Sequence, residues 1–398
     1  MGRAATRASR PASARVSSRA STIGDRFGPT LVAWQRAHGR HALPWQQLGV
    51  ARDSEHEGER GGGSVPYRVW VAEIMLQQTQ VAAVIPFYSR FLERFPDVTS
   101  LAQASQDEVM RYWSGLGYYS RARNLHAAAR RVLCDYGGVF PDDAKALESL
   151  PGVGRSTAAA IRVFAFGRRA AILDGNVKRV LARVFAIEGV PSSTATTRRM
   201  WGLAEELLPA PDTERGIEHY TQGLMDLGAT ICTPRKPSCM ACPFASDCLA
   251  HRQGRVAELP HRAPLKALPH RRVAMLLITR GNQVLLERRP PTGIWGGLWS
   301  LPEALRADDP EELTRRVERF GDVMSLQGEP GFTHNFTHFV LHADVVHARL
   351  KETSRTAQSM LASPTEPMRW VDEADVFELG LPAPIRTLMR AALMDCSD

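Results

Sequence analysis

Residues 232–248 read CTPRKPSCMACPFASDC and hold four of the six cysteines of the chain, spaced as Cys232-x6-Cys239-x2-Cys242-x5-Cys248. Four thiolates so close along the chain can converge on one centre with little loop-closure cost. Structural zinc sites usually have two separated Cys-x2-Cys pairs, and this segment has one such pair. The spacing therefore predicts that all four cysteines ligate a metal centre, and it leaves iron–sulfur and zinc both open.

The composition is that of a globular protein. The chain has 398 residues, enough for two or three domains, with 44% hydrophobic and 23% charged residues. No apolar run approaches the roughly 18 residues that span a bilayer, so we expect no membrane association. A secreted disulfide scaffold would spread its cysteines over a small, loop-rich chain. The clustered cysteines favour a reducing compartment, and the excess of arginine over lysine favours a bacterial source with a GC-rich genome, so we expect a cytoplasmic location.

The positive charge is concentrated at the N-terminus. The formal net charge is +8, and residues 1–24 contain five arginines and no acidic residue. The rest of the chain therefore carries only about +3, which is weak evidence for a nucleic-acid partner. A segment of this composition fits either a mitochondrial presequence or a basic tail. Because no amphipathic apolar stripe is visible, we expect residues 1–24 to be a disordered basic tail.

Helical periodicity dominates the first two thirds of the chain. Residues 46–64 are polar, contain three consecutive glycines at 61–63 and are expected to form a surface insertion. From residue 66 to about residue 228 the pattern is helical, with Gly and Pro punctuation. We therefore expect residues 25–254 to form one mostly helical domain, followed by a Pro-containing linker at 255–270.

The pattern changes after the linker. Two strands joined by the tight-turn dipeptide Gly281-Asn282, a helix and a further strand are expected there, at residues 273–279, 283–287, 309–320 and 339–347. Residues 271–392 are therefore expected to form a smaller α/β domain.

Residues 150–161 read LPGVGRSTAAAI, a turn that opens into an Ala-rich helix. Pro151 cannot continue a preceding helix, and Gly152 and Gly154 allow backbone geometries closed to other residues. The exposed amides at the start of the helix suit a phosphate oxygen. A plain connector between packed helices explains the same turn, so the segment alone leaves phosphate binding open.

Glu73 lies in the apolar segment WVAEIMLQQT, residues 70–79. None of its helical neighbours three or four residues away is cationic, so no local ion pair compensates its charge. Such surroundings are expected to raise the pKa of the Glu73 carboxyl, as a general acid near neutral pH requires. The alternative is a solvated helix glutamate, which is less common on so apolar a segment.

Asp174 lies in ILDGNVKRVL, residues 172–181, directly before an amphipathic helix. It is well placed to cap that helix, and Lys178 four residues later can pair with it. From these residues alone, a structural cap is the favoured interpretation of Asp174.

Together, the cysteine loop, the hairpin and the two acidic segments resemble those of MutY-type adenine DNA glycosylases, which belong to the helix-hairpin-helix superfamily of endonuclease III. The resemblance implies a mostly α glycosylase domain whose four cysteines hold a [4Fe–4S] cluster. It also implies that Glu73 protonates the adenine leaving group, that Asp174 stabilises an oxocarbenium-like sugar and that Asn176 assists Asp174. Cleavage of an N-glycosidic bond needs this division between an acid and an anion, and the base must first leave the stack.

The same resemblance assigns residues to DNA and to the damaged base. It implies that Leu76 helps to fill the vacated stack, that Gln78 probes the base opposite adenine, and that Tyr118 of the loop GLGYYS stacks beside the oxidised guanine. Gln77 can also hydrogen-bond base edges. The other residues expected to lie at DNA are Gly152, Gly154 and Ser156 of the hairpin and Arg235 and Lys236 of the cysteine loop.

The C-terminal segment extends the resemblance. Residues 286–302 resemble the Nudix-like domain of MutY-type proteins, a domain that endonuclease III lacks. The segment HNFTH resembles the loop that reads the lesion in that family, with Thr337 in place of the usual serine. Both side chains carry a hydroxyl group, so lesion recognition by Phe336, Thr337 and His338 is expected to be kept.

The resemblance implies a monofunctional enzyme that removes adenine opposite 8-oxoguanine or guanine. Bifunctional relatives carry a catalytic lysine where this chain has Ser156, so Schiff-base chemistry lacks its nucleophile. The implied partner is double-stranded DNA with A:8-oxoguanine mispairs, bound by a monomer at the bacterial nucleoid.

Two other classes of function compete with this one. A Nudix hydrolase is rejected, because residues 311–319 lack the glutamate pattern of a metal-binding Nudix helix. A non-catalytic iron–sulfur protein that binds DNA would not need both Glu73 and Asp174. The basic tail and the insertion at 46–64 depart from the family pattern, but neither touches an expected catalytic position.

Overall fold

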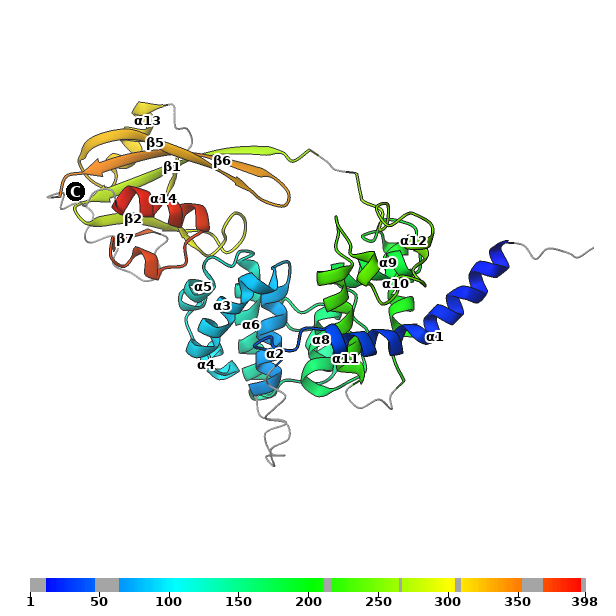
Figure 1. The fold of residues 1–398 in the computed structure, drawn as a ribbon. Helices are drawn as coiled ribbons and strands as arrows, with labels where there is room; N and C mark the ends of the chain where they lie inside the picture. Colours follow the sequence, from blue (N-terminus) through cyan, green and yellow to red (C-terminus); the bar gives the residue numbers. More distant parts are fainter. Residues whose placement is uncertain are drawn as a thin grey trace, which may run out of the picture. The chain divides into compact units, whose positions relative to one another are not determined.

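The computed structural model describes residues 12–46, 64–210, 216–264, 267–304, 309–352 and 368–394. Its contacts divide the chain into two compact units, which are considered separately. Unit 1 comprises Met1–Gln77 and Arg131–Pro264, and unit 2 comprises Gln78–Arg130 and Leu265–Asp398. Figure 1 labels the helices and strands of both units. The insertion expected at 46–64 lies almost entirely outside the described residues.

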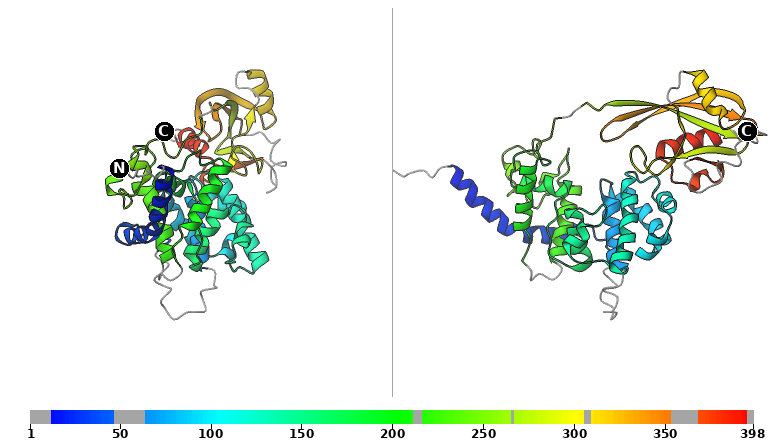
Figure 2. Two further views of the ribbon diagram at one scale, coloured as in Figure 1. Left: turned by 90° about the vertical axis from the view of Figure 1, so that its right-hand side faces the viewer. Right: turned by 180° about the vertical axis from the view of Figure 1, so that it is seen from behind.

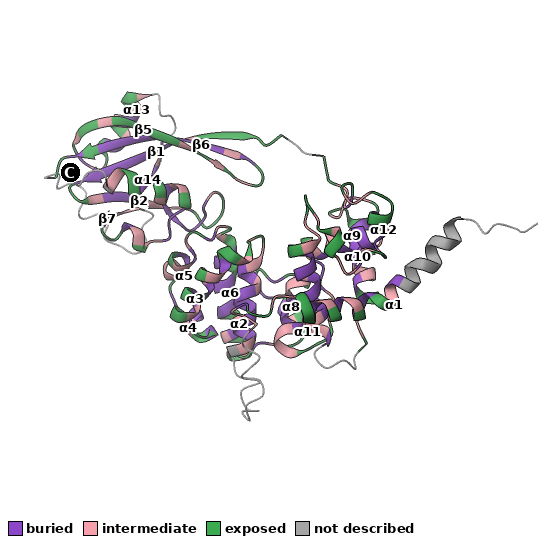
Figure 3. Ribbon diagram, in the orientation of Figure 1, coloured by how far each residue is buried: buried purple, intermediate pink, exposed green. Residues whose placement is uncertain are grey.

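Unit 1 is helical, as the periodicity predicts. Its α-helices are α1 (Ala12–His38), α2 (Ser64–Leu76), α7 (Ala144–Glu148), α8 (Arg155–Phe166), α9 (Gly175–Val184), α10 (Thr194–Glu206), α11 (Gly216–Asp226) and α12 (Leu249–Arg252), with the π-helix η3 (Leu227–Ile231) and the short 3-10 helix η4 (Cys239–Ala241) between the last two. Aromatic side chains tie distant segments together, since Phe27 of α1 stacks on Phe244 with ring centroids 4.6 Å apart and meets Tyr220 of α11 edge-on. Figure 3 shows the buried residues on the packed sides of these helices.

The disordered tail expected at 1–24 differs from the structure in part. Helix α1 begins at Ala12, and residues 1–11 lie outside the described residues. The physical reason is that alanine and arginine have high helix propensity and residues 12–23 contain no glycine or proline. The helix can therefore extend N-terminally from the buried residues Ile23, Phe27 and Leu31.

Unit 2 combines helices with a sheet. The helical segment contains α3 (Val81–Arg94), α4 (Val98–Gln103), α5 (Gln106–Trp113) and most of α6 (Ser120–Tyr136). The C-terminal segment contains β1 (His270–Arg280), β2 (Gln283–Arg288), β3 (Trp299–Ser300), β4 (Glu303–Ala304), α13 (Pro310–Glu318), β5 (Val323–Asn335), β6 (Val340–Leu350), β7 (Met368–Asp372), η6 (Val376–Glu378) and α14 (Ala383–Met394). Residues 78–130 thus belong to the same compact unit as the C-terminal segment. The sequence analysis places them in a domain at 25–254.

The sheet has seven strands, with the path β3-β2-β1-β6-β5 and with β4 on β1 and β7 on β2. β1 and β2 form the expected antiparallel hairpin, and Gly281 in its turn has a φ of 54°. β1 pairs with β6 in parallel from His270↔Val340 to Arg280↔Leu350. Helices α13 and α14 lie on opposite faces of the sheet (Figures 1 and 2). Leu313 and Val317 of α13 pack into the cluster that contains the buried side chains of β1 and β2.

Strand β5 is absent from the sequence-based prediction. Its residues are mostly exposed, and it contains Gly328, Pro330 and Gly331, so it shows no apolar alternation. It is an edge strand, where proline is tolerated because one side of its backbone is unpaired. β5 is a strand because it pairs with β6. Residues 336–339 form the turn that connects the two strands.

Candidate active site

Helix α2 places Glu73 among buried apolar residues. Trp70, Ile74 and Met75 are almost completely buried, and the Trp70 ring packs against Phe140 at 5.2 Å. Glu73 as a whole residue is half-buried, but its carboxyl group is enclosed. Burial is the main cause that raises the pKa of this carboxyl group to about 8. The charge of Asp174 is the second cause, so the two carboxyl groups face a common region. The pKa shift expected from the sequence is confirmed in direction.

Asp174 is the N-cap of α9. Its Oδ1 accepts a hydrogen bond from the Val177 backbone N–H at 2.8 Å, so the capping interpretation is confirmed. Burial raises the pKa of Asp174, whereas the backbone N–H groups of Val177 and Asn176 and then the charges of Arg179 and Lys178 lower it. Capping thus serves the site as well, because it supplies donors that favour the anionic form.

The hairpin ties these two acidic segments together. Gly152 has a φ of 80°, and Gly154 is the N-cap of α8. The Gln77 amide donates to the Gly152 carbonyl at 3.3 Å and to the Thr157 hydroxyl at 3.2 Å, which joins the end of α2 to the turn. Gln77 therefore connects the end of α2 to the hairpin in this structure.

Ser156 makes the second connection. Its hydroxyl accepts a hydrogen bond from the Leu173 backbone N–H at 3.0 Å, directly before Asp174. The start of α8 is thereby fixed to the segment that positions the Asp174 carboxylate. The hairpin, α2 and α9 form one scaffold around the two carboxyl groups.

Arg179 is a residue that the sequence analysis missed. Its guanidinium donates to the side-chain oxygen of Asn176, to the Gly228 carbonyl and to the Cys232 carbonyl, each at 2.7 Å. One side chain thus connects the first turn of α9 to π-helix η3 and to the first cysteine. The sequence holds one signal for the contact with Asn176: Arg179 lies three residues later, and residues so spaced lie on one helix face.

Arg183, one turn further along α9, holds the cysteine loop and was also missed. Its side chain is only 3% exposed. It donates to the carbonyls of Leu259, Thr233 and Pro234 at 2.9, 2.8 and 3.2 Å and to the Cys232 sulfur at 3.3 Å. The first residues of the cysteine loop are therefore hydrogen-bonded to α9, the helix that has Asp174 at its N-terminus.

The four predicted cysteines come together in space. Cys232, Cys239, Cys242 and Cys248 line one cavity, together with apolar residues such as Val180 and Leu227. Burial is the main cause that raises the pKa of the Cys242 thiol to about 12, and the charges of the other three cysteines add to it. Four thiolates in such a place need a positive centre among them. The donor set therefore fits a metal cofactor.

The loop that carries the cysteines also carries two cations. Arg235 and Lys236 of the same loop are exposed to solvent, as a contact with phosphate would require.

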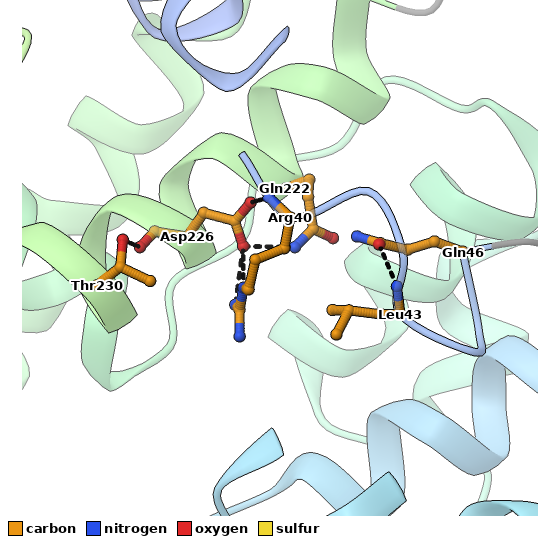
Figure 4. A network of polar contacts seen from close by, with 6 residues as sticks. All are labelled: Arg40, Leu43, Gln46, Gln222, Asp226 and Thr230. Carbon is orange, nitrogen blue, oxygen red and sulfur yellow. Dashed lines mark hydrogen bonds and ion pairs between the residues drawn. The ribbon is translucent and has the colours of Figure 1, made fainter. Parts of the chain in front are cut away.

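A buried aspartate, Asp226, lies at the centre of a network of polar contacts (Figure 4). Asp226 is 1% exposed and accepts hydrogen bonds from the Arg40 backbone N–H, the Arg40 Nε and the Gln222 amide, each at 2.8 Å. It ends α11 directly before η3, where Gly228 packs so tightly that a Cβ there would lie 2.5 Å from the Asn176 Cβ. Asp226 thus fixes the helix end against which Asn176 is packed.

The remaining predicted residues lie on exposed turns. Leu76 ends α2 and is half-buried, and Gln78 is exposed with a φ of 57°. Tyr118 is 45% exposed with a φ of 48°, and Arg121 lies over its ring. Positive φ is uncommon for residues with such side chains. It persists only where the surroundings enforce it, so each of the two turns has a defined backbone conformation.

The expected lesion-reading loop is the turn between β5 and β6. The Phe336 ring stacks on buried Phe339 at 4.5 Å, whereas Thr337 and His338 are exposed. The backbone N–H of Phe336 donates to the carbonyl of Phe339 and closes the turn.

Comparison with known proteins assigns these features to a family. Residues 71–206 match the HhH-GPD superfamily of base excision DNA repair proteins, residues 232–248 the iron-sulfur binding domain of endonuclease III, and residues 273–391 a NUDIX domain. An adenine DNA glycosylase of Buchnera aphidicola is 31% identical over 91% of this chain and 96% of its own length. The chain belongs to the adenine DNA glycosylase family.

Two further proteins are similar to this chain. The adenine DNA glycosylase of Mus musculus is 37% identical over 82% of this chain and 71% of its own length. A solved thermostable thymine-DNA glycosylase is 28% identical, covers 59% of this chain and 99% of its own, and has a TM-score of 0.49. This chain is therefore a DNA repair glycosylase, like the other members of its family. Its cysteine loop is an iron–sulfur binding domain. In the described part of the chain, every helix is too short or too polar to cross a membrane.

Replacement of Arg183 tests the connection between α9 and the cysteine loop. Arg183→Met leaves one buried carbonyl group, that of Leu259, and two part-buried ones without their donor, so the free energy of unfolding is expected to fall by about 2 kcal/mol or more. Arg168→Met is the control, because Arg168 pairs with Asp142 at an exposed site, and its loss is expected to cost less than about 1 kcal/mol. Urea unfolding of both variants measures the difference. Equal losses would contradict the role of Arg183.

Proposed function

We propose that this enzyme releases adenine opposite 8-oxoguanine, or opposite guanine, from double-stranded DNA without cutting the strand. The observation that carries the proposal is the enclosed Glu73 carboxyl, with its pKa raised to about 8, beside Asp174. An acid that keeps its proton at neutral pH can deliver it to a departing base. The names of the curated relatives supply the substrate base, adenine.

The different surroundings of Glu73 and Asp174 give the two acids different roles. Glu73 gains no compensating cation, so it holds a proton and protonates the adenine that leaves. Asp174 receives backbone N–H donors and lies near Arg179 and Lys178, so it supplies the negative charge that stabilises the oxocarbenium-like sugar. Asn176 assists by fixing the start of α9. Water completes the hydrolysis of the N-glycosidic bond.

DNA is held by the hairpin and read by the exposed turns. The backbone amides around Gly152, Gly154 and Ser156 bind a phosphate of the strand that carries adenine. Leu76 fills the space that the everted adenine leaves, and Gln78 contacts the opposite base. Tyr118, Phe336, Thr337 and His338 recognise 8-oxoguanine. Ser156 stands where a strand-cutting enzyme needs a lysine, which supports a monofunctional enzyme.

The four cysteines hold a [4Fe–4S] cluster. A tetrahedral zinc ion needs all its sulfurs about 2.3 Å away, around one point. The match of residues 232–248 to the iron-sulfur binding domain of endonuclease III, and the cavity that the four cysteines share, support a cluster whose ligands bind different iron atoms. The cluster is structural here, because it fixes the loop that Arg179 and Arg183 connect to α9. We further propose that the protein acts as a monomer at the bacterial nucleoid.

Replacement of Glu73 tests the proposed acid. Glu73→Gln keeps the shape of the side chain but has no acidic proton, so adenine release opposite 8-oxoguanine is expected to fall by about 100-fold or more, with DNA binding kept. Glu73 is an acid with a raised pKa, so its protonated fraction, and with it the wild-type rate, is expected to fall as the pH rises through about 8. Single-turnover base release at several pH values measures both effects.

Glu93→Gln, on the exposed surface of α3, is the matched control and is expected to leave the rate unchanged. Near wild-type release by Glu73→Gln would refute the acid assignment. Release of cytosine or thymine in place of adenine would refute the substrate.

Chemical analysis of the purified protein tests the cofactor. We expect a brown protein with iron and acid-labile sulfide in equal amounts, about four of each per chain. Replacement of Cys239 by serine is expected to lower the iron content, whereas the exposed Cys134→Ser control is expected to keep it. A colourless protein that contains zinc would contradict the assignment.

A further inference from the structure

Trp295 of unit 2 is held in an unusual backbone conformation. It has a φ of 53°, a value that is rare for bulky residues, and its side chain is only 7% exposed. The surrounding loop is tight, because a Cβ on Gly296 would lie 2.7 Å from the Pro291 carbonyl oxygen. Strain of this kind persists only where the surroundings enforce it.

The Trp295 ring packs against the hairpin that carries the expected lesion-reading loop. Its centroid lies 6.3 Å from Phe332, 5.9 Å from His334 and 5.9 Å from Phe336. His334 and Phe336 in turn meet edge-on at 4.7 Å. Burial lowers the pKa of His334, which favours the neutral ring in this apolar contact. Trp295 thus contacts both the end of β5 and the first residue of the turn at 336–339.

The loop of Trp295 is anchored on the helical segment of the same unit. The Arg123 guanidinium donates to the Gly296 carbonyl, and burial of this cation lowers its pKa. Arg288, at the end of β2, pairs with Asp107 of α5 at 2.8 Å. Arg123 lies in the first turn of α6, which begins two residues after Tyr118.

These contacts connect the two elements that are expected to recognise the opposite base. Tyr118 precedes α6, and Phe336 begins the turn between β5 and β6. The loop of Trp295 touches α6 through its backbone and the hairpin through its indole ring. Its strained backbone fixes the direction of the ring, so the hairpin is held at a set position relative to α6.

We propose that Trp295 is a positioning residue for opposite-base selectivity, which holds Phe336 and the turn at 336–339 in register with the α6 segment that follows Tyr118. The inference rests on the proposed function. It concerns how the enzyme distinguishes 8-oxoguanine from guanine, and Trp295 takes no part in the release of adenine itself.

The experiment compares adenine release opposite 8-oxoguanine with release opposite guanine under single-turnover conditions. Trp295→Ala removes the ring contacts, so the rate ratio between the two substrates is expected to fall by about tenfold, mainly through loss with 8-oxoguanine. Trp295→Phe keeps an aromatic ring and is expected to retain most of the ratio. Trp370→Ala, a half-buried tryptophan on β7, is the control and is expected to keep the ratio.

A second variant covers the case in which Trp295→Ala fails to fold. Arg123→Met removes the anchor of the loop and is expected to lower the same ratio by about threefold. If the wild type releases adenine opposite neither base, the proposed function fails. If it releases adenine opposite both bases at the same rate, the proposed function stands and the role of Trp295 in selectivity is refuted. If the wild type shows the preference and both variants keep it, or if both substrates slow equally, the role of Trp295 is refuted.

Discussion

An enclosed carboxyl group beside a second carboxyl group is the constraint on which the site depends. Two acids that share a region of low polarity cannot both ionise without cost. In this protein Asp174 receives the backbone donors of a helix start and nearby cations, whereas Glu73 lies among apolar side chains. Burial raises the pKa of both carboxyl groups, but only Asp174 has hydrogen-bond donors and cations that oppose the rise. The proposed cleavage of an N-glycosidic bond depends on this difference between the two acids.

The rest of unit 1 keeps this asymmetry in place. Gln77 and Ser156 fix the hairpin to α2 and to the segment before Asp174. Arg179 joins Asn176 to the cysteine loop, and Asp226 fixes the helix end that packs on Asn176. Each connection is a hydrogen bond, to a backbone group or to a side chain, or a close packing contact. A cofactor bound by the four cysteines would therefore stabilise the start of α9 as well as its own loop.

Much of this arrangement can be predicted from local sequence. The spacing of the cysteines, the apolar residues around Glu73 and the Gly281 turn between two strands are signals carried by short segments. Asp174 could be recognised as a helix cap, but its proximity to Glu73 could not, because the two residues lie a hundred positions apart in the chain.

Features that depend on distant partners were missed for the same reason. Arg179 and Arg183 look like ordinary helix cations until the loop that contains Cys232 is packed on them. Trp295 resembles any core tryptophan until its φ and its contacts with Phe336 are known. Strand β5 has no alternation of its own, and α1 extends further than the composition of its first residues suggests.

The protonation state of Glu73 in the folded enzyme tests the central claim most directly. An infrared difference spectrum between the wild type and Glu73→Gln, recorded across the pH range, reports the carboxylic acid C=O band of this one residue. We predict that the band is present at pH 7 and disappears with a midpoint near pH 8. A band that disappears near pH 4.5, the ordinary value for glutamate, would contradict the account.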